Sequence, residues 1–216
     1  TSPSIFNLRS FFLFLLLSFS LAGCAIKDYG PGAGFFNTVI LDPGHGGHDR
    51  GARPIFGQNE KNLTLDTALR TKPYLQAAGF NVILTRSSDK FIPLEQRVAI
   101  SNKKRNAIFV SIHYNWARRK KARGIETYYL SPRSYRLAAH LQQQLLQAYP
   151  TLNRQIKKAN FYVLRNNTRP AVLLELGFLS NPLDNSAIQS PAIRQRIAEA
   201  IAKGIIREFK GITPNL

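Results

Sequence analysis

Three polar side chains stand out because each lies in or directly after a strongly apolar run of residues. His45 lies in a glycine-rich segment after one such run, His113 ends a second, and Glu175 interrupts a third. Ligand sites in α/β proteins collect beyond the carboxyl ends of the strands, so two imidazoles and a carboxylate at the ends of different strands can converge on one point. Such a group of residues can bind a metal ion or transfer protons.

Glu60 is a fourth candidate because it lies where a loop, residues 51–59, is expected to lead into a helix. The loop is long enough to bring Glu60 over the strand ends. Two histidines and one glutamate around Zn²⁺, with one position open for water, form a hydrolytic zinc site. A single cysteine excludes an internal disulfide and a cysteine-rich zinc site. Together the four residues favour metal-assisted hydrolysis.

Three of these four residues also have an ordinary structural explanation. His45 could occupy a turn, and His113 could be a core histidine that hydrogen-bonds to the backbone. Glu60 could be a carboxylate at a helix N-terminus, where the helix dipole stabilises negative charge. Glu175 is different, because burying an unpaired carboxylate would cost several kcal/mol. It therefore needs a partner or a chemical role.

The elements that must position these residues alternate between strand-like and helix-like segments. Most strand-like segments are nearly continuous runs of Val, Ile, Leu and Phe, which is typical of strands covered on both faces. The sequence therefore predicts a single α/β domain in which helices flank a mostly parallel, twisted sheet of about six strands. Strands are expected at residues 37–41, 80–85, 107–112, 125–130, 160–164 and 171–176, and helices at residues 61–78, 93–106, 135–149 and 192–209.

Two residues bear on the first expected helix. Pro73 lies inside it and is expected to kink or split it, because proline lacks the N–H that the helix requires. Gly79 lies where a glycine commonly ends a helix, just before the next strand.

The first residues resemble an export signal. Arg9 precedes an apolar run, residues 11–22, that is too short to cross a hydrocarbon core of ~30 Å. The sequence Leu21-Ala22-Gly23-Cys24 resembles a bacterial lipobox, in which the cysteine is acylated. An ordinary signal peptide and a membrane anchor that happens to contain a cysteine are the alternatives. The expected organisation is a lipoprotein-type signal peptide, a Gly- and Pro-rich tether and one catalytic domain, over residues 1–23, 24–35 and 36–212.

Composition restricts the class of protein. A hydrophobic fraction of 44% can bury enough apolar surface to exclude general disorder. The formal net charge of +18 indicates an anionic partner, which could be nucleic acid, a membrane surface or an acidic polymer. Within residues 1–23 only Arg9 is charged, so the positive charge belongs to the rest of the chain.

Several segments resemble, in order, the motifs of the zinc-dependent N-acetylmuramoyl-L-alanine amidases, a family of cell-wall hydrolases of the Amidase_3 type. The opening motif is VILDPGHGG at residues 39–47. The others are EKNL at 60–63, VSIH at 110–113 and VLLELGFLSN at 172–181, with further similarity at 79–86, 94–97 and 124–130. Several motifs in the right order are far more specific than one short motif.

This resemblance implies that His45, Glu60 and His113 bind Zn²⁺ and that Glu175 is the catalytic acid and base. The expected reaction is hydrolysis of the amide that joins the lactyl group of N-acetylmuramic acid to L-alanine of the stem peptide, so the expected partner is peptidoglycan. The alternatives are an inactive peptidoglycan-binding lipoprotein and a basic nucleic-acid-binding protein. The export signal and the lack of a nucleic-acid-binding module argue against the latter, and no nucleic-acid partner is expected.

The expected location is the periplasm, where the acylated Cys24 would anchor the protein to a membrane. Ala25 is not the aspartate that signals retention in the inner membrane, so the outer membrane is expected. An activator protein is possible but not required. The reason is that residues 131–149 run directly into a helix and lack the long inserted helix by which divisome-controlled relatives block their own zinc.

The residues after the third motif depart from the family pattern. A small residue is usual there, whereas Tyr114 and Trp116 stand here, and either could line a sugar or peptide subsite or cover the end of the sheet. Asn115 is expected to be solvated, with substrate orientation as the alternative. The basic segment Arg118–Arg123 is either a solvated loop or a patch that attracts anionic lipid or stem-peptide carboxylates.

Three remaining features have simpler explanations. His48 is expected to be an exposed loop residue, and His140 a solvated residue on a Gln-rich helix. Ser101-Asn102-Lys103-Lys104 matches the S-x-x-K motif of penicillin-binding enzymes, in which Ser101 would be the nucleophile with Lys104 beside it. The companion S-x-N and K-T-G motifs are missing, so a chance match is the better explanation.

Overall fold

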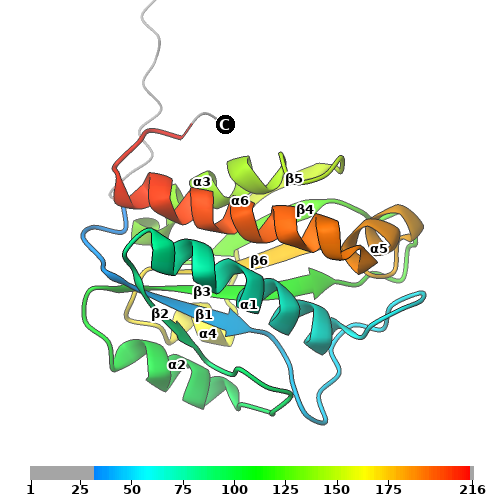
Figure 1. Ribbon diagram of the computed structural model, residues 1–216, viewed down its shortest axis with the longest axis horizontal. Helices are drawn as coiled ribbons and strands as arrows, with labels where there is room; N and C mark the ends of the chain where they lie inside the picture. The colour runs from blue at the N-terminus through cyan, green and yellow to red at the C-terminus, as the bar shows by residue number, and fades with distance from the viewer. Residues whose placement is uncertain (1–31, 215–216) are drawn as a thin grey trace, which may run out of the picture.

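The computed structural model describes residues 32–214, which are built around a six-stranded sheet (Figure 1). The strands are β1 (Thr38–Pro43), β2 (Asn81–Leu84), β3 (Ala107–Asn115), β4 (Ile125–Tyr129), β5 (Asn153–Lys158) and β6 (Ala171–Phe178), in the spatial order β2-β1-β3-β6-β4-β5. β2, β1, β3 and β6 are parallel, whereas β4 is antiparallel to β6 and β5 is parallel to β4. The predicted mostly parallel sheet is confirmed.

Helices cover both faces of this sheet. They are α1 (Glu60–Ala77), α2 (Leu94–Asn102), α3 (Tyr135–Leu145), α4 (Tyr162–Arg165), α5 (Pro182–Gln189) and α6 (Pro191–Phe209), with a 3-10 turn at Pro132–Ser134. α1, α3 and α6 lie on one face, and α2 and α4 lie on the other (Figure 1). Val39 and Leu41 of β1 join the core under the first set, and Ile40 between them joins the core under the second. The predicted single α/β domain is confirmed.

Pro73 is expected to kink or split the first helix; α1 continues through it, so the helix is not split. Proline deprives the carbonyl four residues earlier of its donor, but that residue, Leu69, is 44% exposed and can be hydrated. The prediction for Gly79 is confirmed. Its φ is +89°, and its N–H donates to the Gln76 carbonyl at 2.9 Å.

The strand expected at residues 160–164 is wrong. Phe161 precedes the short helix α4, whose Val163 and Leu164 are buried in the second core. A short apolar run has the same sequence pattern in a strand and in a buried helical turn. The strand beside β4 is instead β5, whose polar sequence NRQIKK suits its position at the edge of the sheet.

Helix α5 is not predicted by its apolar pattern, although its start carries a recognisable signal. Asn181 caps the helix by accepting hydrogen bonds from the N–H groups of Leu183 at 3.0 Å and Asp184 at 3.2 Å, and Pro182 is the first helical residue. Asp184 in turn accepts a hydrogen bond from the N–H of Phe178 at 3.0 Å. This helix therefore fixes the end of β6.

The predicted signal peptide and Cys24 lie outside the described residues, as does most of the predicted tether. The described end of the tether is packed, because Ala33 is buried and its N–H donates to the Glu208 carboxylate of α6 at 2.6 Å. Within residues 32–214, no helix combines the length and the apolar character needed to span a bilayer.

A buried ion pair fixes the carboxyl end of β1. Asp42 Oδ1 lies 2.7 Å from Arg97 Nη1 of α2, and the two side chains are 1% and 3% exposed. Asp42 also accepts hydrogen bonds from the Thr85 hydroxyl at 2.6 Å and the Ser111 hydroxyl at 2.7 Å. Side chains from three neighbouring segments therefore meet on one carboxylate.

Arg97→Ala should lower the free energy of unfolding by about 3–5 kcal/mol, because it leaves the Asp42 carboxylate buried without a cation. Lys103→Ala removes an exposed cation next to the end of the same helix and should change stability by less than about 0.5 kcal/mol. Urea unfolding in the presence of a chelator measures both variants. Equal effects of the two substitutions would contradict this role of the ion pair.

Candidate metal centre

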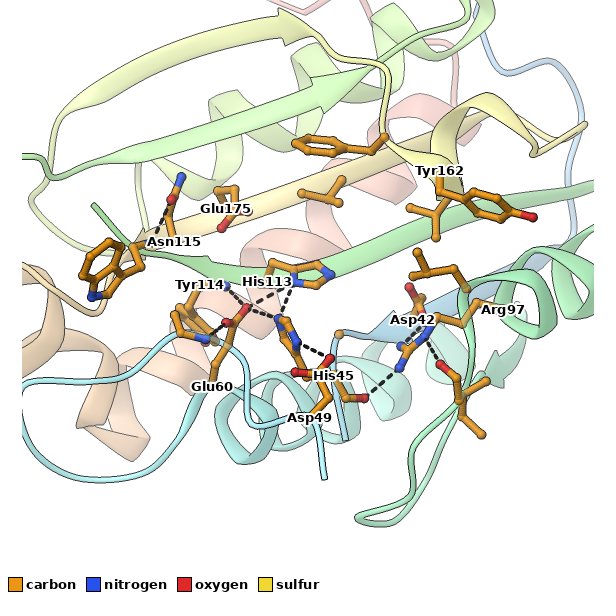
Figure 2. Close-up of a pocket in the computed structure, with 18 of the residues that line it drawn as sticks. Asp42, His45, Asp49, Glu60, Arg97, His113, Tyr114, Asn115, Tyr162 and Glu175 are labelled. Atoms are coloured by element: carbon orange, nitrogen blue, oxygen red, sulfur yellow. Dashed lines mark hydrogen bonds and ion pairs between the residues drawn. The ribbon is translucent and has the colours of Figure 1, made fainter. Parts of the chain in front are cut away.

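The carboxyl ends of β1 and β3 and the N-terminus of α1 meet at one point (Figure 2). His45 lies in the loop after β1, Glu60 is the first residue of α1, and His113 lies near the end of β3. Glu60 Oε1 lies 3.1 Å from both His45 Nε2 and His113 Nδ1, and the two nitrogens are 3.2 Å apart. The structure thus brings together the three residues that the sequence predicts as metal ligands.

The Glu60 side chain is the buried centre of this cluster and is 3% exposed. The Ala52 N–H donates to its Oε2 at 2.5 Å, and the Tyr114 N–H donates to its Oε1 at 3.0 Å. Burial raises the pKa of Glu60, but hydrogen bonds and charge from His113 and His45 outweigh this effect and hold the pKa well below its ordinary value. Glu60 therefore stays ionised at neutral pH and favours a cation beside it.

The atoms His45 Nε2, Glu60 Oε1 and His113 Nδ1 are spaced like the ligand atoms of one metal ion. Histidine nitrogen and carboxylate oxygen bind Zn²⁺ at about 2.0–2.2 Å, and tetrahedral ligands at that distance lie roughly 3.3 Å from one another. The separations here are 3.1–3.2 Å. Three ligands also leave a fourth tetrahedral position for water or substrate. The residues present therefore fit a bound divalent metal ion.

Asp49 orients His45. Its Oδ2 lies 2.8 Å from His45 Nδ1, so a proton on Nδ1 leaves the lone pair on Nε2, the atom that faces Glu60. Burial lowers the pKa of His45, but Glu60 and then Asp49 outweigh this effect and raise the pKa. The sequence does not single out Asp49. The only sequence feature that marks Asp49 is its position two residues after Gly46-Gly47. The chain turns back there, and Gly46 and Asp49 form an isolated antiparallel β-bridge.

The loop that carries His45 is held in a left-handed conformation, with a φ of +61° at His45, which is uncommon for residues other than glycine. Arg97 donates to the carbonyls of Pro43 and His45, both at 2.7 Å. Arg86 donates to the carbonyls of Pro43 at 3.0 Å and Gly44 at 2.8 Å. Burial, and then the charge of Arg97, lower the pKa of Arg86 to about 10, so it stays cationic at neutral pH. These charge-assisted hydrogen bonds offset the backbone strain.

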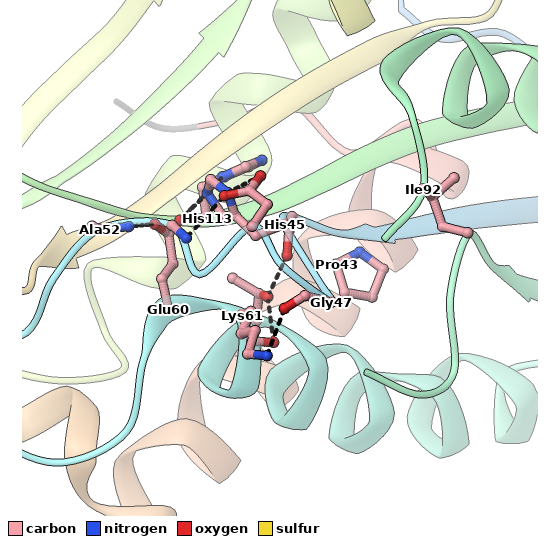
Figure 3. A network of polar contacts seen from close by, with 12 residues as sticks. Pro43, His45, Gly47, Ala52, Glu60, Lys61, Ile92 and His113 are labelled. Carbon is pink, nitrogen blue, oxygen red and sulfur yellow. Dashed lines mark hydrogen bonds and ion pairs between the residues drawn. The ribbon is translucent and has the colours of Figure 1, made fainter. Parts of the chain in front are cut away.

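Two further features fix the place of this loop. Lys61 donates to the Gly47 carbonyl at 2.8 Å (Figure 3). Lys61 also donates to Asp89 at 2.6 Å, and Asp89 accepts a hydrogen bond from the Gly47 N–H at 2.8 Å. Gly44 lies directly against the imidazole of His113, with which a methyl group at this position would collide. A glycine is therefore needed for the loop to approach β3 this closely.

Glu175 lies on β6 directly beside His113, its register partner on β3. Figure 2 shows its carboxyl group pointing toward the space next to His113. The side chain is half-buried, and its Oε2 atom has no hydrogen-bond partner among the described residues. Burial raises the pKa of Glu175 well above its ordinary value, and the charges of Glu60 and Glu126 add to this effect. Such a carboxyl group is suited to accept and release a proton.

Glu126 is buried on β4 directly opposite Glu175. It accepts hydrogen bonds from Lys157 at 2.5 Å, Arg154 at 2.9 Å and the Tyr128 hydroxyl at 2.9 Å. Burial raises the pKa of Glu126, but these donors outweigh the effect and lower it. The ionised carboxylate of Glu126 therefore lies on the strand next to Glu175, at the paired position. The sequence marks Glu126 only as part of a family-like segment.

A cavity of about 690 Å³ opens over the cluster and Glu175. Its polar wall includes the cluster, Glu175 and Asn115, and its apolar wall includes Phe91, Leu94, Phe161 and Val163. A hollow of this size can enclose a small ligand or part of a polymer. All four predicted site residues therefore face one space.

The three residues that follow the third predicted ligand have different surroundings. Tyr114 is 1% exposed, with its hydroxyl 2.7 Å from that of Thr67, so it covers the end of the sheet and packs into the core. Asn115 is half-buried and donates to Glu126 at 2.7 Å, so the expectation of a solvated residue is wrong. Trp116 is 53% exposed and lines the cavity.

The other two histidines lie outside the cluster. His48 is exposed and stacks on Phe91 with 4.2 Å between ring centroids, as expected for an exposed loop residue. His140 is completely buried, so the expectation of a solvated residue is wrong. Helix α3 packs between β4 and α6, where His140 Nε2 lies 3.7 Å from the Glu208 carboxylate.

The S-x-x-K match does not form a catalytic pair. Ser101 is buried, and its hydroxyl donates to Asn167 Oδ1 at 2.9 Å. Lys104 is exposed. The structure therefore agrees with a chance match.

Comparison with known proteins places this arrangement in a family. A family model described as N-acetylmuramoyl-L-alanine amidase (Amidase_3) matches residues 39–207. The chain belongs to this amidase family. All four predicted site residues of the chain lie within the matched segment, which confirms the resemblance seen in its motifs.

The chain is similar to individual proteins over most of its length. An uncharacterized cell wall amidase of Bacillus anthracis is 40% identical in an alignment of 193 residues, which covers 81% of this chain and 36% of that relative. The catalytic domain of CwlV, an N-acetylmuramoyl-L-alanine amidase from Bacillus (Paenibacillus) polymyxa var. colistinus, is 36% identical with a TM-score of 0.77, covering 82% of this chain and 100% of that one. The CwlD amidase from Clostridioides difficile, solved in complex with the GerS lipoprotein, is 31% identical with a TM-score of 0.77. The match covers 81% of this chain and 99% of that one. The chain thus spans about a third of the first relative and nearly all of the two solved domains.

One divalent metal ion should bind to this chain through His45, Glu60 and His113. Asp49→Asn should weaken the affinity for Zn²⁺ by about 10–100-fold, because His45 loses the carboxylate that fixes its orientation. Glu95→Gln removes an exposed carboxylate on α2 and is the control. Competition with a chromophoric chelator measures the affinities, and equal values for the two variants would contradict the role of Asp49.

Proposed function

We propose that the amidase uses Zn²⁺ to hydrolyse the amide bond between the lactyl group of N-acetylmuramic acid and L-alanine of the peptidoglycan stem peptide. The observation that carries this proposal is the convergence of His45, Glu60 and His113 on one point, directly beside Glu175. Membership of the N-acetylmuramoyl-L-alanine amidase family supports the same reaction, as does the similarity to the catalytic domain of CwlV.

The donor set supports zinc as the metal. Two imidazoles and one carboxylate are ligands of catalytic zinc sites, whereas Mg²⁺ and Ca²⁺ prefer oxygen ligands alone. A bound Zn²⁺ would lower the pKa of a water molecule toward about 7 and polarise the scissile carbonyl.

Glu175 performs the proton transfers in this proposal. Its carboxylate accepts a proton from the attacking water and then donates it to the leaving nitrogen of L-alanine, which otherwise leaves poorly. The raised pKa of Glu175 suits the first step, because it makes the carboxylate a stronger base toward the attacking water. Glu60 has a lowered pKa and remains an anionic ligand. Two carboxyl groups of the same cavity are thus assigned opposite roles by their surroundings.

We further propose that the amidase is exported and anchored in the periplasm through an acylated Cys24, at the outer membrane. The signal-like segment and the lipobox-like sequence support this proposal. An activator is possible, since the similar CwlD amidase forms a complex with the GerS lipoprotein. Activity without one is expected, because no residue of the segment 131–149 lines the described cavity.

Digestion of purified peptidoglycan tests the reaction. The full chain should release intact stem peptides that begin with L-alanine, identified by mass spectrometry. Release should stop when a chelator removes the metal and resume when Zn²⁺ is added. Cleaved sugar strands or unaltered stems would refute the proposed reaction.

Glu175→Gln should lower kcat by about 10²–10⁴-fold, because the amide can neither accept nor return the proton. Binding to sedimented peptidoglycan should persist. Glu95→Gln, which removes an exposed carboxylate in the first turn of α2 that does not line the cavity, should retain full turnover. A wild-type chain that binds peptidoglycan but shows no turnover would identify an inactive binding protein instead.

Glu126→Gln should move the acid limb of the pH profile to lower pH. The ionised form of Glu175 accepts the proton, so activity falls as the pH drops through the pKa of this group. Removing the negative charge of Glu126 lowers that pKa, and the midpoint of kcat/KM should follow it downward. The profile of Glu95→Gln is the reference, and an unchanged or upward-shifted midpoint would contradict this coupling.

A further inference from the structure

A second hollow borders the catalytic cavity. It has a volume of about 560 Å³ and shares two wall residues, Ala52 and Trp116, with the cavity over the metal-binding cluster. The Ala52 N–H also holds the Glu60 carboxylate. The two hollows are therefore contiguous, and a long substrate could occupy both.

This second hollow is positively charged. Arg53, Arg118 and Lys120 line it, and no acidic residue does. None of the three takes part in an ion pair among the described residues, whereas cations such as Arg97 and Arg154 are paired with carboxylates. Their charges are therefore free to bind an anionic group of a ligand.

Both walls of the hollow are fastened to the segment that follows β6. The hydrogen bonds run from the Ala117 N–H to Ser180 Oγ (3.0 Å), from Asn181 Nδ2 to the Lys120 carbonyl (2.6 Å) and from the Ile55 N–H to the Leu179 carbonyl (3.2 Å). Because β6 carries Glu175, the backbone around the three cations is held at a fixed position relative to the proposed acid and base.

The two sides of the proposed scissile amide differ in charge. N-acetylmuramic acid has its lactyl carboxyl group in that amide and is otherwise neutral, whereas the stem peptide carries free carboxylates. The catalytic cavity is walled by apolar residues such as Phe91 and Phe161, and the basic hollow adjoins it. Charge complementarity therefore assigns the peptide to the basic hollow.

We propose that Arg53, Arg118 and Lys120 form a subsite that binds carboxylates of the stem peptide and thereby sets the direction in which the substrate lies. This subsite rests on the proposed amidase function. The three residues lie between the family-like motifs, so they can differ from one family member to another while the residues of the motifs stay the same. The subsite favours stems with free carboxylates over stems whose carboxyl groups are amidated.

The test compares two soluble N-acetylmuramoyl stem peptides of equal length, one with free carboxyl groups and one with these groups converted to primary amides. The full chain is compared with the triple variant Arg53→Gln, Arg118→Gln, Lys120→Gln. The control is Lys103→Gln, Lys104→Gln, Arg105→Gln, which loses the same charge from an exposed run that lines neither hollow.

The triple variant should raise KM for the free-carboxyl substrate by about tenfold, with kcat unchanged and the amidated substrate unaffected. The control should change neither substrate's KM by as much as twofold. Added NaCl should raise KM of the wild-type chain for the free-carboxyl substrate and have little effect on the triple variant.

Three outcomes would overturn the subsite: an unchanged KM, an equal rise for both substrates, or an equal rise in the control. Loss of binding to phosphatidylglycerol vesicles with an unchanged KM would assign the cations to lipid, and would overturn it as well. Should the triple variant fail to fold, Arg53→Gln and Lys120→Gln, which lie on separate segments, are tested singly.

Calorimetric binding to the Glu175→Gln variant separates this proposal from the proposed function. A wild-type chain that cleaves neither substrate contradicts the amidase reaction. The Glu175→Gln variant still reports whether the three further substitutions weaken binding of the free-carboxyl peptide alone, and equal binding with and without them contradicts the subsite.

Discussion

The carboxylate of Glu60 lies where three parts of the chain meet, and its charge must be satisfied there. N–H groups of Ala52 and Tyr114 and the rings of His45 and His113 all contact it. An uncompensated charge this deeply buried would cost several kcal/mol. The loop after β1, the end of β3 and the start of α1 are therefore stable in this arrangement only together, and a bound cation would stabilise all of them.

The parallel strands make this meeting possible. β1, β3 and β6 end at the same edge of the sheet, so side chains far apart in the sequence lie on neighbouring strands there. The Asp42–Arg97 ion pair then holds the loop whose left-handed residue is His45. Scaffold and site are thus connected by charged groups that are themselves buried, which limits how far either can move.

Environment, rather than residue type, distinguishes the carboxyl groups of the cavity. Glu60 is surrounded by donors and keeps its charge, whereas Glu175 is half-buried, lacks such donors and faces the ionised Glu126. The walls of the two adjoining hollows also differ, because apolar residues such as Phe91 and Phe161 line the hollow over the cluster and unpaired cations line the hollow beside it. A substrate with one neutral and one anionic half suits that asymmetry.

The sequence by itself determined the α/β class and predicted the four residues that the structure brings into one cavity, because continuous apolar strands and ordered motifs are local patterns. Tertiary structure alone decided which polar residues support them. Asp49 and Glu126 act through partners that no periodicity marks. His140 is buried because α6, far along the chain, packs over it. β5 is a strand despite its polar residues because β4 pairs with it, and such long-range contacts leave no trace in a local pattern.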